Sequence, residues 1–134
     1  MRRLTLLAVL ALGLAACGGS GTQNLKITFG LSGGTMRPYS VTIAPGGAVT
    51  TTGLPYGKPK PVTSGKDAEL SGLVRKGFAD FKNDQCPGTF PDESAMFITA
   101  LGRTITVRGS CEPGFTQLWN SLITSATTVN LTTF

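Results

Sequence analysis

The stretch that decides the fold is AMFITALGRTITVRG, residues 95–109. Two segments that alternate apolar and polar residues flank Gly102-Arg103, and glycine at the first position of a two-residue loop is typical of a type II′ hairpin turn. This turn pairs Ala100 with Ile105 and Ile98 with Val107. One face of the predicted hairpin then belongs to the core: Met96, Ile98, Ala100, Ile105 and Val107. The other face is polar except for two residues that need a cover or form an exposed apolar patch, Phe97 and Leu101.

Three shorter strands are predicted upstream of this hairpin. Residues 26–31 alternate, with Ile27, Phe29 and Leu31 on one face, and residues 39–43 and 48–52 follow as further strands. Ser32-Gly33-Gly34-Thr35 is expected to form the first turn and Pro45-Gly46-Gly47 the second, because paired glycines permit the positive φ of a tight reversal. The three strands are expected to form an antiparallel meander.

Two amphipathic helices are predicted from residues that recur at helical spacing. The first starts at Ser64, which with Asp67 has the spacing of a capping box, and it ends near Asn83. Its apolar stripe comprises Leu70, Leu73, Val74, Phe78 and Phe81. The second starts at Pro113, a residue that suits the first helical turn. Its stripe comprises Phe115, Leu118, Trp119, Leu122 and Ile123, for which core packing is the expected role.

These elements predict an α+β fold, an antiparallel sheet in the order β-β-β-α-β-β-α with both helices packed on one face. The tail, residues 127–134, is rich in threonine and is expected either to pair with a sheet edge or to fray.

The start of the chain, MRRLTLLAVLALGLAACGGS, has the pattern of a secretory signal peptide. Two arginines precede an apolar run from Leu4 to Leu14, which is too short to span a bilayer. Its ending, Leu14-Ala15-Ala16-Cys17, resembles the lipobox of bacterial lipoproteins. The resemblance implies that residues 1–16 are removed and that Cys17 carries acyl chains such as palmitate, which anchor an exported chain to a bacterial cell membrane. An ordinary cleaved signal peptide is the alternative.

The remaining chain divides into a short tether and one domain. Residues 17–24 include GGSGTQN, the composition of a flexible linker, and residues 25–134 form the single α+β domain. With Cys17 assigned to lipid, Cys86 and Cys111 remain as an even pair in an oxidising compartment, and we expect a disulfide between them. A redox-active pair is the alternative, but its Cys-x-x-Cys motif is absent. The disulfide would join the end of the first helix to the start of the second.

The charge of the chain argues against a nucleic-acid partner. The formal net charge is +5, and two of the cations, Arg2 and Arg3, belong to the signal peptide. The other basic residues are scattered rather than gathered in a stripe with aromatic residues between them.

The residue types that most catalytic sites need are missing or isolated. The chain has no histidine, which removes the triads that depend on it and the histidine-based metal sites. Asp92-Glu93 is the only adjacent acidic pair and lacks calcium-loop spacing, so a solvated loop pair is expected there. Nothing selects a carboxylate pair for glycoside hydrolysis. We therefore expect no enzyme activity, no cofactor and no metal.

The order of the elements resembles that of the emfourin family. The resemblance rests on the strand that runs into Ser32-Gly33-Gly34, the helix over residues 67–82, the hairpin around Gly102-Arg103 and the closing helix with Phe115, Leu118 and Leu122. It covers roughly residues 26–125 and implies an inhibitor of protealysin-like, thermolysin-type metallopeptidases. The family pattern has neither the export signal nor the disulfide.

Inhibition would need a rigid exposed loop that fits a cleft. Two segments are candidates for such a loop, and both also read as plain connectors. They contribute the candidate partner-binding residues Ser32, Gly33, Gly34, Thr35, Met36, Arg37, Leu54, Pro55 and Tyr56.

Together these features predict a membrane-anchored lipoprotein with a small, non-catalytic protein-binding domain. Its expected partners are the membrane, through Cys17, and a secreted or envelope metallopeptidase or another envelope protein. The alternatives are a structural lipoprotein of the envelope and, third, an enzyme that works without histidine.

Overall fold

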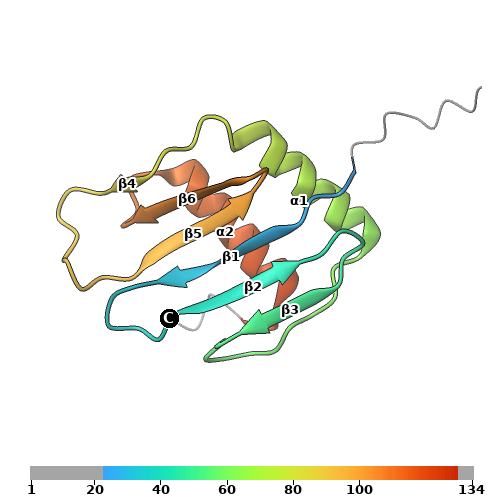
Figure 1. Cartoon of the computed structure of the whole chain (residues 1–134), viewed down its shortest axis with the longest axis horizontal. Coiled ribbons are helices and arrows are strands. Elements are labelled where there is room, and N and C mark those ends of the chain that lie inside the picture. The colour runs from blue at the N-terminus through green and yellow to red at the C-terminus, as the bar shows by residue number, and fades with distance from the viewer. Residues whose placement is uncertain (1–22, 130–134) are drawn as a thin grey trace, which may run out of the picture.

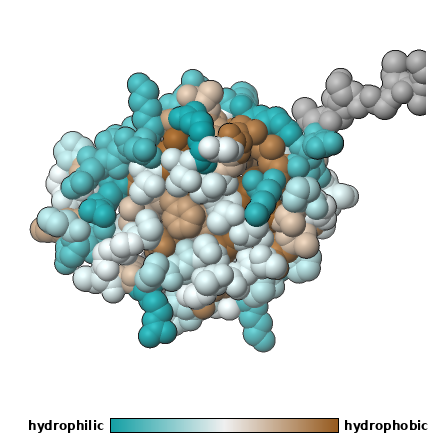
Figure 2. Space-filling view, in the orientation of Figure 1, coloured by the Kyte–Doolittle hydropathy of each residue, from teal (hydrophilic) through white to brown (hydrophobic). Residues whose placement is uncertain are grey.

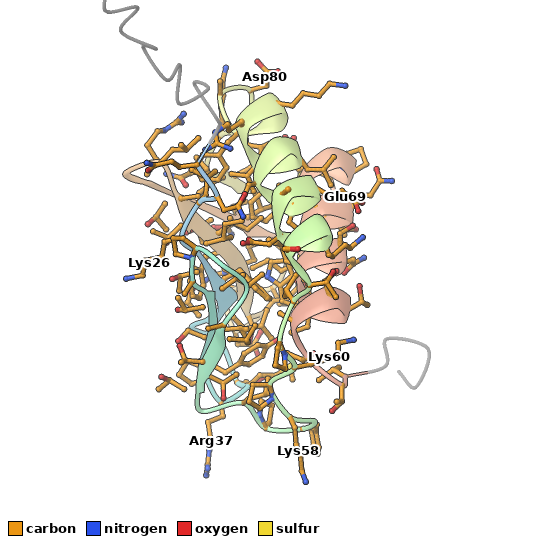
Figure 3. The ribbon with its side chains drawn as sticks, turned by 90° about the vertical axis from the view of Figure 1, so that its right-hand side faces the viewer. Lys26, Arg37, Lys58, Lys60, Glu69 and Asp80 are labelled. Atoms are coloured by element: carbon orange, nitrogen blue, oxygen red, sulfur yellow. A yellow bond between two sulfur atoms is a disulfide. The ribbon has the colours of Figure 1, made fainter. Side chains whose placement is uncertain are left out.

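The computed structural model describes residues 23–129, in which two helices cover one face of a six-stranded sheet. Figure 1 shows the sheet in front of the helices, and Figure 3, turned by 90°, shows the two layers side by side. The strands are β1 (Ile27–Ser32), β2 (Tyr39–Ile43), β3 (Val49–Thr52), β4 (Asp84–Gln85), β5 (Ala95–Ala100) and β6 (Arg103–Arg108). The helices are α1 (Ser64–Gly77) and α2 (Pro113–Ala126). The predicted α+β class is confirmed.

The sheet has the order β3-β2-β1-β5-β6-β4. The predicted meander β1-β2-β3 and the predicted hairpin β5-β6 are both antiparallel, and β1 joins them by pairing with β5. The prediction of a purely antiparallel sheet is wrong in one detail. The two-residue strand β4 pairs in parallel with β6, so the sheet is mixed. The residues of β4, Asp84 and Gln85, are exposed and polar, and they carry no alternating pattern to reveal a strand.

The β5–β6 turn differs from the predicted type II′ turn. Ala100 pairs with Arg103 and Ile98 with Ile105, so the loop residues are Leu101 and Gly102. Their φ values of 52° and 71° are both positive, as in a type I′ turn. The register is therefore shifted by two residues along β6. Because side chains alternate with a period of two, this shift leaves the predicted core face unchanged.

The core lies between the sheet and the helices and contains most of the apolar residues predicted for it. Both aromatic and aliphatic side chains fill it: Ile27, Phe29, Val41, Ile43, Leu70, Val74, Phe78, Ile98, Ile105, Val107, Phe115, Leu118, Trp119, Leu122 and Ile123. Leu73, predicted to belong to the apolar stripe of α1, is 42% exposed. Leu101, which the sequence predicted to be either covered by another element or exposed, is exposed at the β5–β6 turn.

α1 starts at Ser64, as predicted, but its capping residue and its end differ from the prediction. Thr63, one residue before Ser64, caps the helix by accepting a hydrogen bond from the Lys66 N–H. The helix ends at Gly77 rather than near Asn83, because the chain turns over residues 78–80 and Phe81 folds back against Gly77. Asp67 is not part of a capping box.

The Asp67 carboxylate is fully buried and joins three segments of the chain. Its Oδ2 accepts hydrogen bonds from Asn24 Nδ2 at 2.8 Å and from the Gly46 N–H at 2.9 Å. One turn further along α1, Ser71 Oγ accepts a hydrogen bond from the Leu25 N–H at 2.9 Å. These bonds fix the start of the described chain and the β2–β3 turn against α1.

The predicted disulfide between Cys86 and Cys111 is confirmed, with 5.5 Å between the two Cα atoms. Its position differs from the expected one. Cys111 does precede α2, but Cys86 directly follows β4 and lies nine residues beyond the end of α1. The bond therefore ties the β4 edge of the sheet, rather than α1, to the start of α2.

The open face of the sheet faces the viewer in Figure 1, and in Figure 2 the middle of this face is mostly white to pale teal, the colours of intermediate hydropathy. Side chains across five strands form one row of threonines, Thr50, Thr42, Thr28, Thr99 and Thr104. Two pairs within the row share hydrogen bonds, Thr28 with Thr42 at 2.9 Å and Thr99 with Thr104 at 2.8 Å. Such cross-strand pairs stabilise neighbouring strands.

Candidate functional site

An apolar pocket of about 240 Å³ lies at the end of the sheet where β1 passes into β2. Its walls come from four parts of the chain, the β1–β2 connection, the segment after β3, helix α2 and the segment after α2. The lining residues are Leu31, Met36, Tyr39, Leu54, Pro55, Tyr56, Trp119, Ile123 and Val129. The exposed wall is almost entirely carbon.

The pocket brings together the two loops that the sequence suggested for partner binding. Met36 comes from the first loop, and Leu54, Pro55 and Tyr56 come from the second. The other candidates in the first loop do not line the pocket: Ser32, Gly33, Gly34, Thr35 and Arg37. Two lining residues are unusually exposed for their size, since Met36 is 49% and Tyr56 67% accessible to solvent. They form an apolar rim that is open to a partner.

The inner wall is held by Trp119 of α2. Its indole Nε1 donates a hydrogen bond to the Gly30 carbonyl at 3.1 Å, and its ring meets Phe29 edge to face with centroids 6.3 Å apart. Trp119 is therefore a core residue, as its spacing predicted, whose outer edge also lines the pocket. Tyr39, at the start of β2, forms part of the same wall. Burial raises the pKa of Tyr39 to about 12, so its phenol keeps its proton and can donate a hydrogen bond.

The loop over residues 32–37 is bonded to the loop that precedes β5. The Thr35 N–H donates to the Asp92 carbonyl at 2.9 Å, and Ser94 Oγ donates to the Gly33 carbonyl at 3.0 Å. Arg108 supports the second loop by donating to the Pro91 carbonyl at 3.2 Å. These bonds place Met36 at the pocket.

The segment after β3 is held by the segment after α2. Lys60 N–H donates to the Ala126 carbonyl, and Lys58 and Thr128 exchange two hydrogen bonds of 2.8 and 2.9 Å. Gly57 lies where these segments touch, with a φ of 77°, and a Cβ there would come within 2.7 Å of Val129. The positive φ and the lack of space beside Val129 both favour glycine at this position, and Val129 itself lines the pocket.

Three cations lie at the same end of the molecule as the pocket. Figure 3 shows Arg37 and Lys58 at one end of the molecule with Lys60 close by, whereas Asp80 lies at the opposite end. Arg37 directly follows the lining residue Met36, and Lys58 is two residues after the lining residue Tyr56. The chain has no acidic residue before Asp67, so β1, β2, β3 and their loops contribute only positive charges.

Away from the pocket, within the part of the chain that the structure describes, Asp84, Cys111 and Glu112 lie close enough together to be possible metal ligands. Cys111 cannot act as a thiolate because its sulfur is bonded to Cys86. The two remaining carboxylates carry no further sign of a site. Asp92 and Glu93 are exposed in the loop before β5, as expected for a solvated pair.

Several pocket residues were missed by sequence reasoning, among them Tyr39, Trp119 and Val129. Each has a pattern that fits a strand, a core helix or a tail, and the pocket arises only because these elements end at one place. Cys17 and the predicted signal peptide lie outside the described residues, as do residues 130–134 of the tail. Within residues 23–129, no helix is long and apolar enough to cross a membrane.

Comparison of the chain with models of protein families, with curated proteins and with solved structures found no match. The resemblance to emfourins therefore stays a prediction from the order of the elements.

Proposed function

We propose that this chain is a lipid-anchored, non-catalytic binding protein of the bacterial cell envelope. Cys17 holds the acyl anchor, residues 17–24 are the tether, and the domain presents its apolar pocket to a protein partner. The observation that carries this proposal is the convergence of the two candidate loops on one pocket, with Met36 and Tyr56 exposed at its rim.

The position of the pocket suits a tethered domain. The described chain enters the fold at the start of β1, and the pocket lies at the other end of that strand, beside Leu31. Four residue steps separate Ile27 from Leu31, or about 13 Å along a strand. In Figure 3 Lys26, which directly precedes β1, is labelled at mid-height on the sheet side, whereas Arg37 and Lys58 are at the bottom. A tether that reaches the domain from the membrane would thus leave the pocket facing away from the bilayer.

The chemistry of the pocket supports binding rather than catalysis. Its wall carries no carboxylate, lysine, arginine or cysteine, and the only titratable groups among the lining residues are the phenols of Tyr39 and Tyr56. General acid–base catalysis needs a group whose pKa lies near the working pH. Burial moves the pKa of Tyr39 away from that range, to about 12.

Inhibition of a thermolysin-type metallopeptidase is the particular form of binding that we propose for testing. The loop over residues 32–37 is exposed, yet it is fixed at Gly33 and Thr35 by hydrogen bonds to the loop before β5. A fixed loop loses little conformational entropy when it enters a cleft. This rigidity agrees with the role that the emfourin resemblance implies.

Two experiments test the proposal. Cells that express the full chain are labelled with radioactive palmitate, and the label is expected on the wild type and not on Cys17→Ser. Equal labelling of the two, or none in the wild type, would contradict the anchor. The purified full chain is then incubated at micromolar concentration with thermolysin and a fluorogenic peptide. Substrate cleavage that is unchanged with several such peptidases would exclude inhibition and favour a structural role in the envelope.

A further inference from the structure

We propose that the pocket takes one large apolar side chain from an extended, acidic segment of the partner protein, and that this segment pairs with the free edge of β3. The inference rests on the proposed binding function and specifies the chemistry of the partner.

The size of the pocket suits a single side chain. Sites for drug-sized ligands usually enclose roughly 300–1,000 Å³, and this pocket, at about 240 Å³, is smaller. Its wall offers three aromatic rings, from Tyr39, Tyr56 and Trp119. Aromatic pockets of this kind favour a phenylalanine or leucine side chain, which gains affinity by leaving water and by ring contacts.

The charge around the pocket selects an acidic segment. Arg37 and Lys58 are exposed and flank lining residues, and no acidic residue precedes Asp67 in the chain. Asp92 and Glu93 are in the loop before β5, which is joined to the pocket loop because the Thr35 N–H donates to the Asp92 carbonyl. Arg108 bonds to that same loop and offsets part of their charge. A neutral or basic segment would find no complementary charge at Arg37 and Lys58.

The edge of β3 supplies the backbone partner for an extended segment. The Ala44 N–H donates to the Ala48 carbonyl, so hydrogen-bonded pairs continue at Thr42–Thr50 and Ser40–Thr52. The N–H and C=O groups of Val49 and Thr51 therefore point away from β2, and in residues 23–129 no hydrogen bond occupies them. The chain returns beside β3 to Val62, whose N–H donates to the Gly47 carbonyl, so the part of this edge left for a partner is Val49 to Thr51 (Figure 1). β3 leads directly into Leu54, Pro55 and Tyr56, so a strand added over Val49 to Thr51 runs toward the pocket.

A short peptide tests this proposal without knowledge of the partner. The full chain, expressed with its own leader and placed in phosphatidylcholine nanodiscs, is titrated calorimetrically with acetyl-TEVEFEVET-amide. We expect binding that weakens about 10- to 100-fold when the central phenylalanine becomes alanine. Replacing the glutamates by lysines should abolish it, as should N-methylation of alternate peptide nitrogens, which removes the donors to the β3 edge. Raising NaCl from about 50 to about 500 mM should weaken it severalfold.

Matched variants locate the interaction. Tyr56→Ala removes a rim residue that is 67% exposed, and Leu101→Ala removes an exposed apolar residue at the other end of β5. Lys58→Gln removes a positive charge beside the pocket, and Lys82→Gln, which removes an exposed positive charge elsewhere, is its control. Only Tyr56→Ala and Lys58→Gln should weaken binding of the peptide, each by about tenfold. Circular dichroism checks that all four variants remain folded.

Three outcomes would overturn the inference. The first is that acetyl-TEVEFEVET-amide does not bind. The second is that the acidic peptide and its lysine counterpart bind equally well. The third is that phosphatidylglycerol vesicles bind at the same residues and the acidic peptide does not. The first and second leave the acyl anchor on Cys17 and the peptidase assay untouched, so they refute the partner chemistry alone. Loss of the palmitate label, in contrast, would refute the anchor and leave the peptide result standing.

Discussion

Replacing Leu101 with asparagine is expected to give a more stable protein than replacing it with alanine. Leu101 adopts a φ of 52°, a left-handed conformation that costs most residues roughly 1–2 kcal/mol and that asparagine tolerates. The leucine side chain is 51% exposed, so both substitutions lose similar apolar contacts. With Gly102 beside it, asparagine completes the preferred type I′ sequence. The free energy of unfolding of Leu101→Asn should therefore exceed that of Leu101→Ala by about 1 kcal/mol.

Urea unfolding followed by circular dichroism measures this difference, and thermal melting gives a second reading. A difference of about 1 kcal/mol corresponds to roughly 4–8 °C in Tm for a small domain. Equal stability, or a less stable asparagine variant, would refute the type I′ turn. Such a result would favour the type II′ turn at Gly102-Arg103, in which Leu101 is an extended strand residue and asparagine is a poor replacement.

Three further predictions concern stability and titration. Replacing both Cys86 and Cys111 by serine should lower the free energy of unfolding by about 3.5 kcal/mol, the chain-entropy value for a separation of 25 residues, and an unchanged urea midpoint would contradict it. Asp67→Ala should cost about 1.5–3 kcal/mol because it removes the buried carboxylate that accepts hydrogen bonds from Asn24 Nδ2 and the Gly46 N–H, while Asp67→Asn should cost less because its amide oxygen can still accept such a bond; equal losses in the same urea assay would contradict the assignment. Since Tyr39 has its pKa raised from 10.0 to about 12, the unfolded chain releases this proton first, so stability should fall as the pH rises through that interval; ultraviolet titration of wild type against Tyr39→Phe checks it, and a Tyr39 pKa near 10 would refute it.

The parts of the fold that depend on periodicity could be predicted from the sequence. The alternation of Ile98, Ala100, Ile105 and Val107 defined the buried face of the hairpin even though the register was displaced by two residues. A displacement by an even number keeps each side chain on its own face, so the core prediction did not depend on the turn type. The pairing of Cys86 with Cys111 could be predicted from the expected export of the chain and from the number of cysteines, which are independent of geometry.

Features that depend on tertiary contacts could not be predicted in this way. β4 exists because residues 84–85 reach the edge of β6, and nothing in their composition marks a strand. Asp67 has the spacing of a capping residue, but its carboxylate is instead buried against Asn24 and Gly46, which lie 43 and 21 residues away in the chain. Local patterns report the helix start and contain no information on such distant donors.

The candidate site was predictable only in part. The segments with Met36 and with Leu54, Pro55 and Tyr56 stood out as exposed loops, and the structure brings them together at the pocket. Nothing in the sequence indicated that they meet, because the meeting depends on Gly57 packing against Val129 and on Trp119 reaching the Gly30 carbonyl. The sequence offered two separate loops, whereas the structure has one surface.

The fluorescence of Trp119 tests most directly the claim that this pocket is the binding end of the molecule. Trp119 is the single tryptophan of the chain and lines the pocket, so its emission reports occupancy without a label. Titration of acetyl-TEVEFEVET-amide into the full chain should change the emission in a saturable way, with the same midpoint as the calorimetric titration, and Tyr56→Ala should shift that midpoint about tenfold. Calorimetric binding with unchanged Trp119 emission, or an emission change that Leu101→Ala weakens as much as Tyr56→Ala does, would contradict the claim.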